Sequence, residues 1–297
     1  MKTRISVPRK GVKDKYEPFS VLIPVYYKDN PSFLTDALQS IEDQTLVPTE
    51  IVIVKDGPVP REIDEVISCF IQHCSIDTSV VPLKENRGLG NALNEGLARC
   101  NNNVIARMDA DDISMKERFE VQFGVLRAGE YDLVGSVVEE FSSENPRVSR
   151  LRKVPETHDD IVRFAKRRNP VNHPTVMFRK EAVEAAGGYK EIAGFEDYFL
   201  WARMLVNGSK FFNVQEPLLR FRTDKNTFRR RGGIAYLGRE ISFRKQLVEI
   251  GLISPWELVF DLFPRTLLRL APNKLRRFVY ARLLRSCSIS LLSVLVF

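Results

Sequence analysis

The chain has 297 residues, of which 44% are hydrophobic and 28% are charged, and its formal net charge is +7. This length and apolar content fit one large folded unit or two smaller ones and exclude an intrinsically disordered chain. The positive charge favours an anionic partner, such as nucleic acid, anionic lipid or a nucleotide sugar. The four cysteines and three histidines form no spacing typical of zinc sites or disulfide frameworks, so we expect reduced thiols in a cytosolic protein.

The first predicted elements follow a polar, basic segment, which we expect to be a flexible tail (1–18) without a secretory signal. A buried strand is predicted at residues 19–25, and Asn30 and Pro31 mark the start of the helix after it. Further strands are predicted at 50–54, 79–83, 104–108 and 133–138, with helical segments between them. Ser114 and Glu117 predict a capping box before the last of these strands.

This alternation of strands and helices predicts an α/β fold with a mainly parallel sheet that is covered on both faces. Ligands bind such sheets at the carboxyl ends of the strands. Four residues lie at or just beyond predicted strand ends and are expected to converge there: Tyr26, Asp56, Arg87 and Asp109.

The pattern is less regular after residue 141. A loop that enters a strand is predicted at 169–178, a turn at 187–189, a helix at about 196–208 and a last strand at 218–222. From Phe228 onward the chain is predicted to be helical and basic, with prolines dividing the helices. No apolar run approaches the roughly 18–20 residues that span a bilayer.

Two acidic clusters are the strongest candidates for chemistry. Asp109, Asp111 and Asp112 follow a predicted buried strand, where neighbouring carboxylates repel one another and require a cation. Glu196 and Asp197 begin an apolar helix, where a carboxylate can act as a general base. Each cluster taken alone also fits a solvated turn or a helix cap.

Six short motifs follow one another along the chain. They are VLIPVY at 21–26, IVKDG at 53–57, NRGL at 86–89, DADD at 109–112, HPT at 173–175 and EDYFLW at 196–201. In their order and spacing they resemble the motifs of the inverting family 2 glycosyltransferases of the GT-A fold. The resemblance is to the bacterial branch that builds O-antigen, capsule and exopolysaccharide repeat units, and it spans residues 19–225.

The resemblance implies a Rossmann-like, nucleotide-sugar-binding half at 19–140, an acceptor-binding half at 141–225 and a helical, basic extension at 226–297. It implies that Asp109 and Asp111 hold Mn²⁺ or Mg²⁺ against the donor diphosphate, with Ala110 between them in the donor site. Asp109 is also expected to contact the ribose. Asp112 is expected to be a local hydrogen-bond acceptor rather than a metal ligand.

For the rest of the donor, the resemblance implies that Pro24, Val25 and Tyr26 pack on the base and that Asp56 accepts a hydrogen bond from the uracil N–H. Arg87 is expected either to reach a phosphate or the ribose or to be a surface cation. Galactose or glucose is the favoured sugar on the UDP carrier.

For the acceptor, the resemblance implies that Asp197 is the general base of a single displacement that inverts the anomeric centre and forms a β-linkage. Glu196 is expected to orient the acceptor or to cap the helix. His173 is expected near the donor diphosphate or the acceptor, or in a structural hydrogen bond. Trp201 fits either the apolar core or stacking on a sugar.

The acceptor that the resemblance implies is a polyprenyl-diphosphate-linked oligosaccharide at the inner face of the bacterial cytoplasmic membrane. Arginines at 229–231 and 265–285 alternate with apolar residues, which fits a segment lying on an anionic membrane surface. The same segment also fits a helix that packs against the domain.

Two other classes of protein remain open from the residues. A sugar-phosphate nucleotidyltransferase uses similar carboxylates but usually a glycine-rich loop after the first strand, where this chain has Pro24, Val25 and Tyr26. A nucleic-acid-binding protein is suggested only by the basic C-terminal region, and no known DNA- or RNA-binding motif accompanies it.

Overall fold

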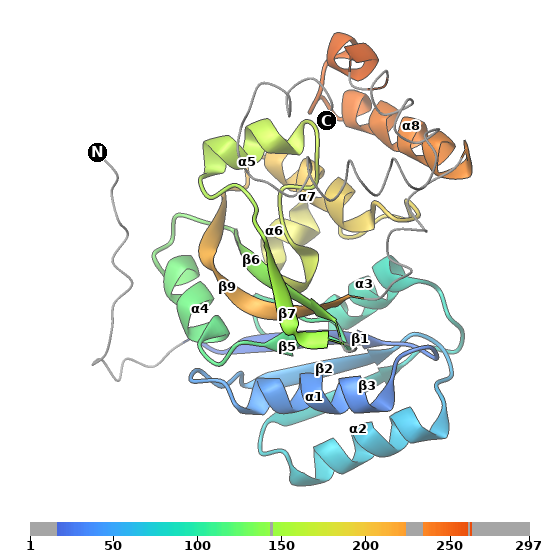
Figure 1. The fold of residues 1–297 in the computed structure, drawn as a ribbon, viewed down its shortest axis with the longest axis vertical. Coiled ribbons are helices and arrows are strands. Elements are labelled where there is room, and N and C mark those ends of the chain that lie inside the picture. The colour runs from blue at the N-terminus through green and yellow to red at the C-terminus, as the bar shows by residue number, and fades with distance from the viewer. Residues whose placement is uncertain (1–16, 143–144, 224–233, 261, 263–297) are drawn as a thin grey trace.

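The computed structural model describes residues 17–142, 145–223, 234–260 and 262 (Figure 1). Residues 1–16 of the expected flexible tail lie outside the described residues. So do residues 226–233 and 263–297 of the expected basic extension, including its arginines at 229–231 and 265–285.

The first half of the chain forms a parallel sheet from buried, largely β-branched segments. Its strands are β1 (Phe19–Val25), β2 (Glu50–Lys55), β3 (Asp77–Pro82) and β4 (Val104–Arg107), in the spatial order β3-β2-β1-β4. The parallel pairing of all four strands confirms the sequence prediction. The chain moves outward from β1 to β3 and then returns to the other side of β1. The switch point between β1 and β4 is where such sheets bind ligands.

The second half extends the same sheet with strands of both directions. β8 (Met177–Arg179) is antiparallel to β4 and to β6 (Leu133–Ser142), whereas β9 (Phe211–Thr223) is parallel to β6. The short β5 (Ile113–Ser114) pairs with β9, and β7 (Asn145–Arg152) pairs with β6. The last strand expected at 218–222 begins earlier, at Phe211, because its first residues also pair with β6. The register shifts near Pro217, which has no N–H to donate to the ladder.

Helices cover both faces of the sheet (Figure 1). One face packs against α1 (Pro31–Glu42), α2 (Arg61–His73) and α4 (Arg118–Arg127). The other packs against α3 (Leu89–Arg99), α5 (His158–Ala165), α6 (Lys180–Ala185), α7 (Glu196–Val206) and α8 (Ile234–Glu249). Among the helices in the described part of the chain, none has the length and apolar character needed to cross a membrane.

The predicted start of α1 is confirmed, whereas the predicted capping box is wrong. Asn30 is the N-cap of α1, and its side chain accepts a hydrogen bond from Ser32 N at 2.9 Å. Ser114 instead lies in β5, where its backbone N–H donates to Ser40 Oγ at 3.0 Å. α4 begins after Glu117, which makes no side-chain capping bond, because strand pairing with β9 holds Ser114 away from the helix start.

Helix α3 lies unusually close to the sheet at Gly96. A Cβ atom at this position would lie 2.3 Å from Leu22 Cδ1 and 2.6 Å from Val54 Cγ2, both in the buried core. In α4, by contrast, a Cβ atom at Gly124 would have no neighbour within 4 Å.

We therefore expect opposite effects from two Gly→Ala substitutions in helices. Gly96→Ala should lower the free energy of unfolding by about 1–3 kcal/mol, because overpacking outweighs the gain in helix propensity. Gly124→Ala should raise it by about 0.5–1 kcal/mol. Urea denaturation of both variants measures the difference, and a stabilising Gly96→Ala would contradict the close packing of α3.

Candidate active site

The residues predicted to bind the donor lie at one edge of the sheet. Tyr26 directly follows β1, Asp56 directly follows β2, and Asp109 lies two residues beyond β4. Because these strands are parallel, their carboxyl ends share one edge, as the sequence predicted. Arg87 lies between β3 and α3, and its side chain is exposed.

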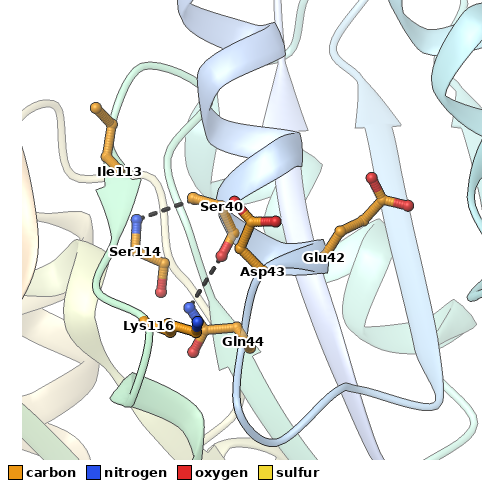
Figure 2. Close-up of a pocket in the computed structure, with 7 residues that line it drawn as sticks. All are labelled: Ser40, Glu42, Asp43, Gln44, Ile113, Ser114 and Lys116. Carbon is orange, nitrogen blue, oxygen red and sulfur yellow. Dashed lines mark hydrogen bonds between the residues drawn. The ribbon is translucent and has the colours of Figure 1, made fainter.

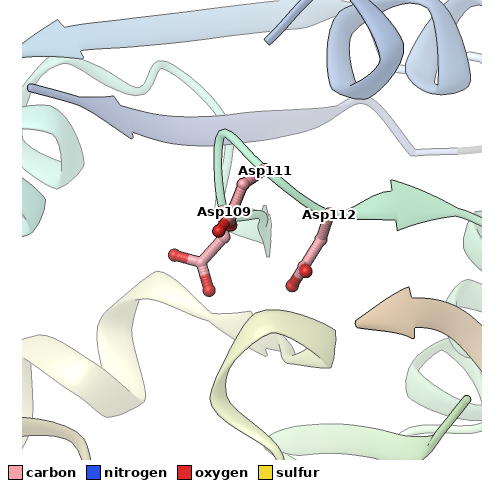
Figure 3. A group of neighbouring side chains, drawn as sticks. All are labelled: Asp109, Asp111 and Asp112. Atoms are coloured by element: carbon pink, nitrogen blue, oxygen red, sulfur yellow. The ribbon is translucent and has the colours of Figure 1, made fainter. Parts of the chain in front are cut away.

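Asp109, Asp111 and Asp112 form an acidic cluster in which their carboxylate oxygens lie within 4.8 Å of one another. Their side chains extend to the same side of the loop between β4 and β5 (Figure 3). Burial, followed by repulsion from Asp109, raises the pKa of Asp111 to about 6. Burial and both neighbours raise the pKa of Asp112 well above its ordinary value. The cluster thus carries more negative charge than this environment favours.

Asp29, in the loop after β1, adds a fourth carboxylate to this region. Its Oδ2 accepts a hydrogen bond from Tyr26 N at 2.8 Å. Burial raises the pKa of Asp29 to about 7, and repulsion from Asp111 and Asp109 contributes to the rise. The sequence pattern gave no reason to select Asp29, because its proximity to the cluster depends on the pairing of β1 with β4.

Arg107, at the end of β4, fixes the position of Asp109. It is 1% exposed, and its terminal nitrogens donate to the two carboxylate oxygens of Asp109 at 2.6 and 2.5 Å. Burial alone would lower the pKa of Arg107, but Asp109 raises it above its ordinary value. Behind this pair, the buried Arg118 of α4 donates to the backbone oxygen of Arg107 at 2.7 Å. Sequence reasoning missed Arg107 because it lies within an apolar strand.

Arg222 of β9 connects the acidic cluster to the second half of the sheet. Its backbone N–H donates to Asp112 Oδ1 at 2.9 Å, and its Nε donates to the backbone oxygen of Asp111 at 2.9 Å. Its Nη2 lies 3.1 Å from Asp36 on α1, and its guanidinium lies over the ring of Phe33. Arg222 was predicted only as a strand residue, and its contact with the cluster arises from tertiary pairing.

The residues of the cluster fit a divalent cation. Asp112 Oδ2 is buried and has no hydrogen-bond partner among the described residues. Hard divalent cations prefer carboxylate oxygens, and an ion held by Asp109 and Asp111 would offset the negative charge around this buried oxygen. Asp112 Oδ1 is a local hydrogen-bond acceptor, as expected from the sequence.

Asp56 has a structural role beside the one expected for it. It is 4% exposed, and its two carboxylate oxygens accept hydrogen bonds from Arg87 N at 2.7 Å and from Gly88 N at 3.0 Å. Gly57 has a φ of 84°, and a Cβ atom there would lie 2.5 Å from Asn86 N. Asp56 therefore joins the loop after β2 to the loop that begins α3.

The three residues expected to contact the base differ in exposure. Pro24 and Val25 are buried, and the backbone oxygen of Val25 accepts a hydrogen bond from Asp56 N at 2.8 Å. Tyr26 is 38% exposed and presents its ring at the surface. Ala110, between the two expected metal ligands, is buried.

The second acidic pair lies in the first turn of α7. Glu196 accepts a hydrogen bond from Gly194 N at 3.0 Å, which stabilises the turn before the helix. Asp197 Oδ2 accepts a hydrogen bond from Asn169 Nδ2 at 2.6 Å. Asp197 thus lies beside the partial positive charge of the helix N-terminus.

Three aromatic side chains form a cluster next to Asp197 and the acidic cluster: His173, Tyr189 and Trp201. His173 Nε2 lies 3.0 Å from the hydroxyl of Tyr189, and the ring of Trp201 contacts both. Burial raises the pKa of Tyr189, and Asp197 and Asp109 both add to the rise, so Tyr189 lies within electrostatic reach of both carboxylates. Trp201 is fully buried, which places it in the core and not at a sugar-stacking surface.

His173 is a neutral component of this aromatic cluster. Burial and then the charge of Arg107 hold its pKa well below the ordinary value of 6.5. Its hydrogen bond with Tyr189 agrees with the structural role that was one of the alternatives predicted for His173. Tyr189 itself was recognised in the sequence only as part of a turn.

A separate pocket of about 470 Å³ lies where the end of α1 meets β5 (Figure 2). In it, Gln44 Nε2 donates to the backbone oxygen of Ser40 at 2.9 Å, and Ser114 N donates to Ser40 Oγ at 3.0 Å. The first bond closes the end of α1, and the second holds β5 against it. They therefore fix the segment that directly follows the acidic cluster.

Together, the parallel sheet, the acidic cluster at its carboxyl edge and the second carboxylate at the start of α7 define a glycosyltransferase of the GT-A class. The chain belongs to glycosyltransferase family 2, whose model, described as "Glycosyl transferase family 2", matches residues 20–187. Family membership decides in favour of glycosyl transfer over the nucleotidyltransferase and nucleic-acid-binding alternatives.

Two curated bacterial proteins are similar over nearly their whole length. The chain is 36% identical over 275 residues to a UDP-Gal:alpha-D-GlcNAc-diphosphoundecaprenol beta-1,3-galactosyltransferase of Escherichia coli, which covers 92% of this chain and 99% of the relative. It is 38% identical over 268 residues to the amylovoran biosynthesis glycosyltransferase AmsE of Erwinia amylovora, covering 89% of this chain and 98% of the relative.

Among solved structures, the fold is similar to the mannosyltransferase PcManGT from Pyrobaculum calidifontis in complex with GDP-Man and Mn²⁺. The TM-score is 0.59 at 16% identity, and the alignment covers 94% of this chain and 80% of that one. This likeness confirms the expected GT-A fold.

In the metal-free protein, we expect the free energy of unfolding to fall as the pH rises from about 5 to 8. The pKa values of Asp29 and Asp111 are about 7 and about 6 in the folded protein, against an ordinary 3.8. The folded state therefore binds more protons than the unfolded state, and this stabilisation is lost as the pH rises through 6 and 7. Urea denaturation in EDTA at several pH values measures the slope.

Two variants test the assignment to the acidic region. Asp29→Asn should flatten the slope, because it removes one of the carboxylates whose pKa is raised in the folded protein. Asp159→Asn, at an exposed acid in the first turn of α5, should leave the slope unchanged. Equal slopes in the wild type and in Asp29→Asn would contradict the raised pKa of Asp29.

Proposed function

We propose that this glycosyltransferase transfers a hexose from a UDP-sugar to a polyprenyl-diphosphate-linked acceptor, with inversion and with the help of a divalent metal ion. The observation that carries the proposal is the acidic cluster at the carboxyl edge of the sheet, with a separate carboxylate at the start of α7. The similarity to an undecaprenol-linked galactosyltransferase and to an amylovoran biosynthesis glycosyltransferase supports a place in bacterial surface polysaccharide synthesis, of the O-antigen or exopolysaccharide kind.

For the donor, the proposal assigns the uracil N–H to Asp56 and the face of the base to Tyr26, with backbone contacts from Pro24 and Val25. The backbone N–H of Arg87 donates to Asp56, and its side chain is exposed. The proposal therefore assigns the Arg87 side chain to the ribose or to a phosphate. We favour galactose as the sugar, because the Escherichia coli relative is named as using UDP-Gal.

For the metal ion, Asp111 and Asp109 are the proposed ligands, and Mn²⁺ or Mg²⁺ is the proposed ion. When bound, the ion offsets the negative charge that grows on the leaving diphosphate. Arg107 holds the Asp109 carboxylate in one orientation, and Arg222 holds the backbone at Asp111. These contacts fix the donor site before the donor binds, so less ordering is needed on binding.

For the acceptor, Asp197 is the proposed general base, which takes the proton from the attacking hydroxyl group. A single displacement on an α-linked nucleotide sugar then yields a β-linkage. Glu196, which accepts a hydrogen bond from Gly194 N, shapes the turn beside the acceptor. His173 and Trp201 contact Tyr189 in the core and support the acceptor side from there.

We expect this acceptor to bring the enzyme to the inner face of the cytoplasmic membrane as a peripheral protein. Trp256, Val259 and Phe260 are 74%, 60% and 77% exposed, and their spacing in a helical segment puts them on one face. From residue 262 to the end, the sequence contains seven Lys or Arg and no Asp or Glu. Each basic residue near an anionic leaflet contributes about 1 kcal/mol to binding.

The catalytic assignment predicts the loss of transfer in two carboxylate variants. Asp197→Asn should lower kcat by about 10²- to 10⁴-fold, because it removes the base. Asp111→Asn should abolish the dependence of the rate on Mn²⁺. The assay measures UDP release from UDP-galactose, with membranes that carry lipid-linked acceptor, with and without Mn²⁺.

Asp159→Asn is the matched control, because Asp159 also lies in the first turn of a helix but is far from these residues in the chain. It should retain wild-type turnover. Wild-type turnover in Asp197→Asn would show that the base is assigned wrongly. If the enzyme released nucleotide only from another nucleotide sugar, and not from UDP-galactose, the assignment of the donor would be wrong.

The membrane assignment predicts weaker binding to anionic vesicles in Trp256→Ala/Phe260→Ala. Burial of such a side chain in an apolar phase contributes about 1.5–3 kcal/mol, so partitioning should fall by about tenfold or more. Co-sedimentation with phosphatidylglycerol vesicles measures the change, and Ile71→Ala on α2 is a control at another partly exposed apolar residue. Equal sedimentation of all three proteins would exclude this face as the membrane contact.

A further inference from the structure

The side chain of Asn169 donates a hydrogen bond directly to Asp197, the proposed base. Its Nδ2 lies 2.6 Å from Asp197 Oδ2, and its Oδ1 accepts a hydrogen bond from Val171 N at 3.3 Å. A backbone N–H can only donate, so the amide oxygen must face Val171 and the NH₂ group must face Asp197. The contact is therefore a hydrogen bond donated to the carboxylate.

The loop that carries Asn169 is held in place from two other elements. Arg244 of α8 is 1% exposed, and its guanidinium donates to the backbone oxygen of Lys166 at 2.6 Å and to that of Arg167. Asn213 of β9 donates to the backbone oxygen of Pro170 at 3.1 Å. Asn169 thus lies on a segment with fixed backbone on both sides.

The base is tied to the same segment by a second contact. Tyr198, the residue after Asp197 on α7, donates from its hydroxyl to the backbone oxygen of Ala165 at 2.5 Å. The start of α7 is therefore hydrogen-bonded both to the end of α5 and to the loop that follows it. The Asn169 amide therefore restricts the orientation of the Asp197 carboxylate through its hydrogen bond to Oδ2.

We propose that Asn169 is a positioning residue of the transfer reaction, which holds the Asp197 carboxylate in the orientation that receives the proton of the acceptor hydroxyl. This inference rests on the proposed role of Asp197 as the base. A hydrogen bond donated to a carboxylate also favours its ionised form, which is the form that a base requires.

The groups around Asp197 allow its titration to be followed. Tyr189, whose pKa is raised by burial, and His173 behind it, whose pKa is lowered by burial and by Arg107, are both neutral near pH 7. Glu196, on the same helix, accepts from Gly194 N. The carboxylates of the acidic cluster are common to the wild type and to every Asn169 variant. A change in the acid limb of the pH–rate profile between the wild type and Asn169→Ala therefore reports on Asp197, whereas in Asn169→Asp the limb reports on the pair of neighbouring carboxylates.

The experiment compares kcat, the KM for UDP-galactose and the pH–rate profile of Asn169→Ala and Asn169→Asp at saturating Mn²⁺. In Asn169→Ala, kcat should fall by about 10- to 100-fold with an unchanged KM for the donor, because the base loses its orientation. Its acid limb should move to higher pH. Asn169→Asp is nearly isosteric and should move the limb further, because a second carboxylate faces Asp197.

Asn103→Ala is the matched control. Asn103 Nδ2 also donates to a carboxylate, that of Glu181, at 3.3 Å, but it lies before β4 at the amino edge of the sheet. Its variant should keep the wild-type kcat and pH profile. Asp197→Asn completes the set, because it tests the base itself.

The outcomes separate the two assignments. If both Asn169 variants keep the wild-type kcat and acid limb while Asp197→Asn is inactive, the positioning role is wrong and the base assignment stands. If kcat falls in Asn169→Asp without a shift of the acid limb, Asn169 is only structural. If Asp197→Asn retains transfer, the proposed base is wrong, whatever the Asn169 variants show.

Discussion

Three carboxylates whose oxygens lie within 4.8 Å repel one another, and the surrounding structure holds them together before any cation binds. Arg107 holds both oxygens of Asp109, and Arg118 supports the backbone of Arg107 from α4. Arg222 reaches the same loop from β9. Burying these guanidinium groups is costly unless carboxylates or backbone oxygens compensate them. The carboxylates of the acidic cluster and the guanidinium groups around it therefore compensate each other's charge. These contacts join α4, β4 and β9 at the carboxyl edge of the sheet.

The same contacts join the two halves that the sequence suggested. The sheet is continuous through β4, β8, β6 and β9, so no separate core divides a donor half from an acceptor half. Arg222 extends this continuity to the loops, because it contacts Asp111 and Asp112 after β4 and Asp36 on α1. The position of the last strand is thus part of the geometry of the acidic cluster.

Most of the first half was predictable because each strand is a short, buried, β-branched run bounded by turn residues. The acidic cluster was predictable for a similar reason, since carboxylates directly after such a strand must lie at the carboxyl edge of the sheet. The second half was less predictable. α5 is short, β7 is polar, and β9 contains Pro217, which ordinarily argues against a strand. Arg107, Arg222, Asn169 and Tyr189 could not be selected, because each acts through a partner that only the folded chain brings near.

His173 and Tyr189 form a hydrogen-bonded pair that is neutral near pH 7. The charge of Arg107 acts on both members of this pair. Tyr189 also responds to Asp197 at the start of α7 and to Asp109 in the acidic cluster, because both carboxylates raise its pKa. A change of charge at either end therefore acts on the same buried hydroxyl group. Tyr189 is thus a single reporter for the two acidic groups of the fold.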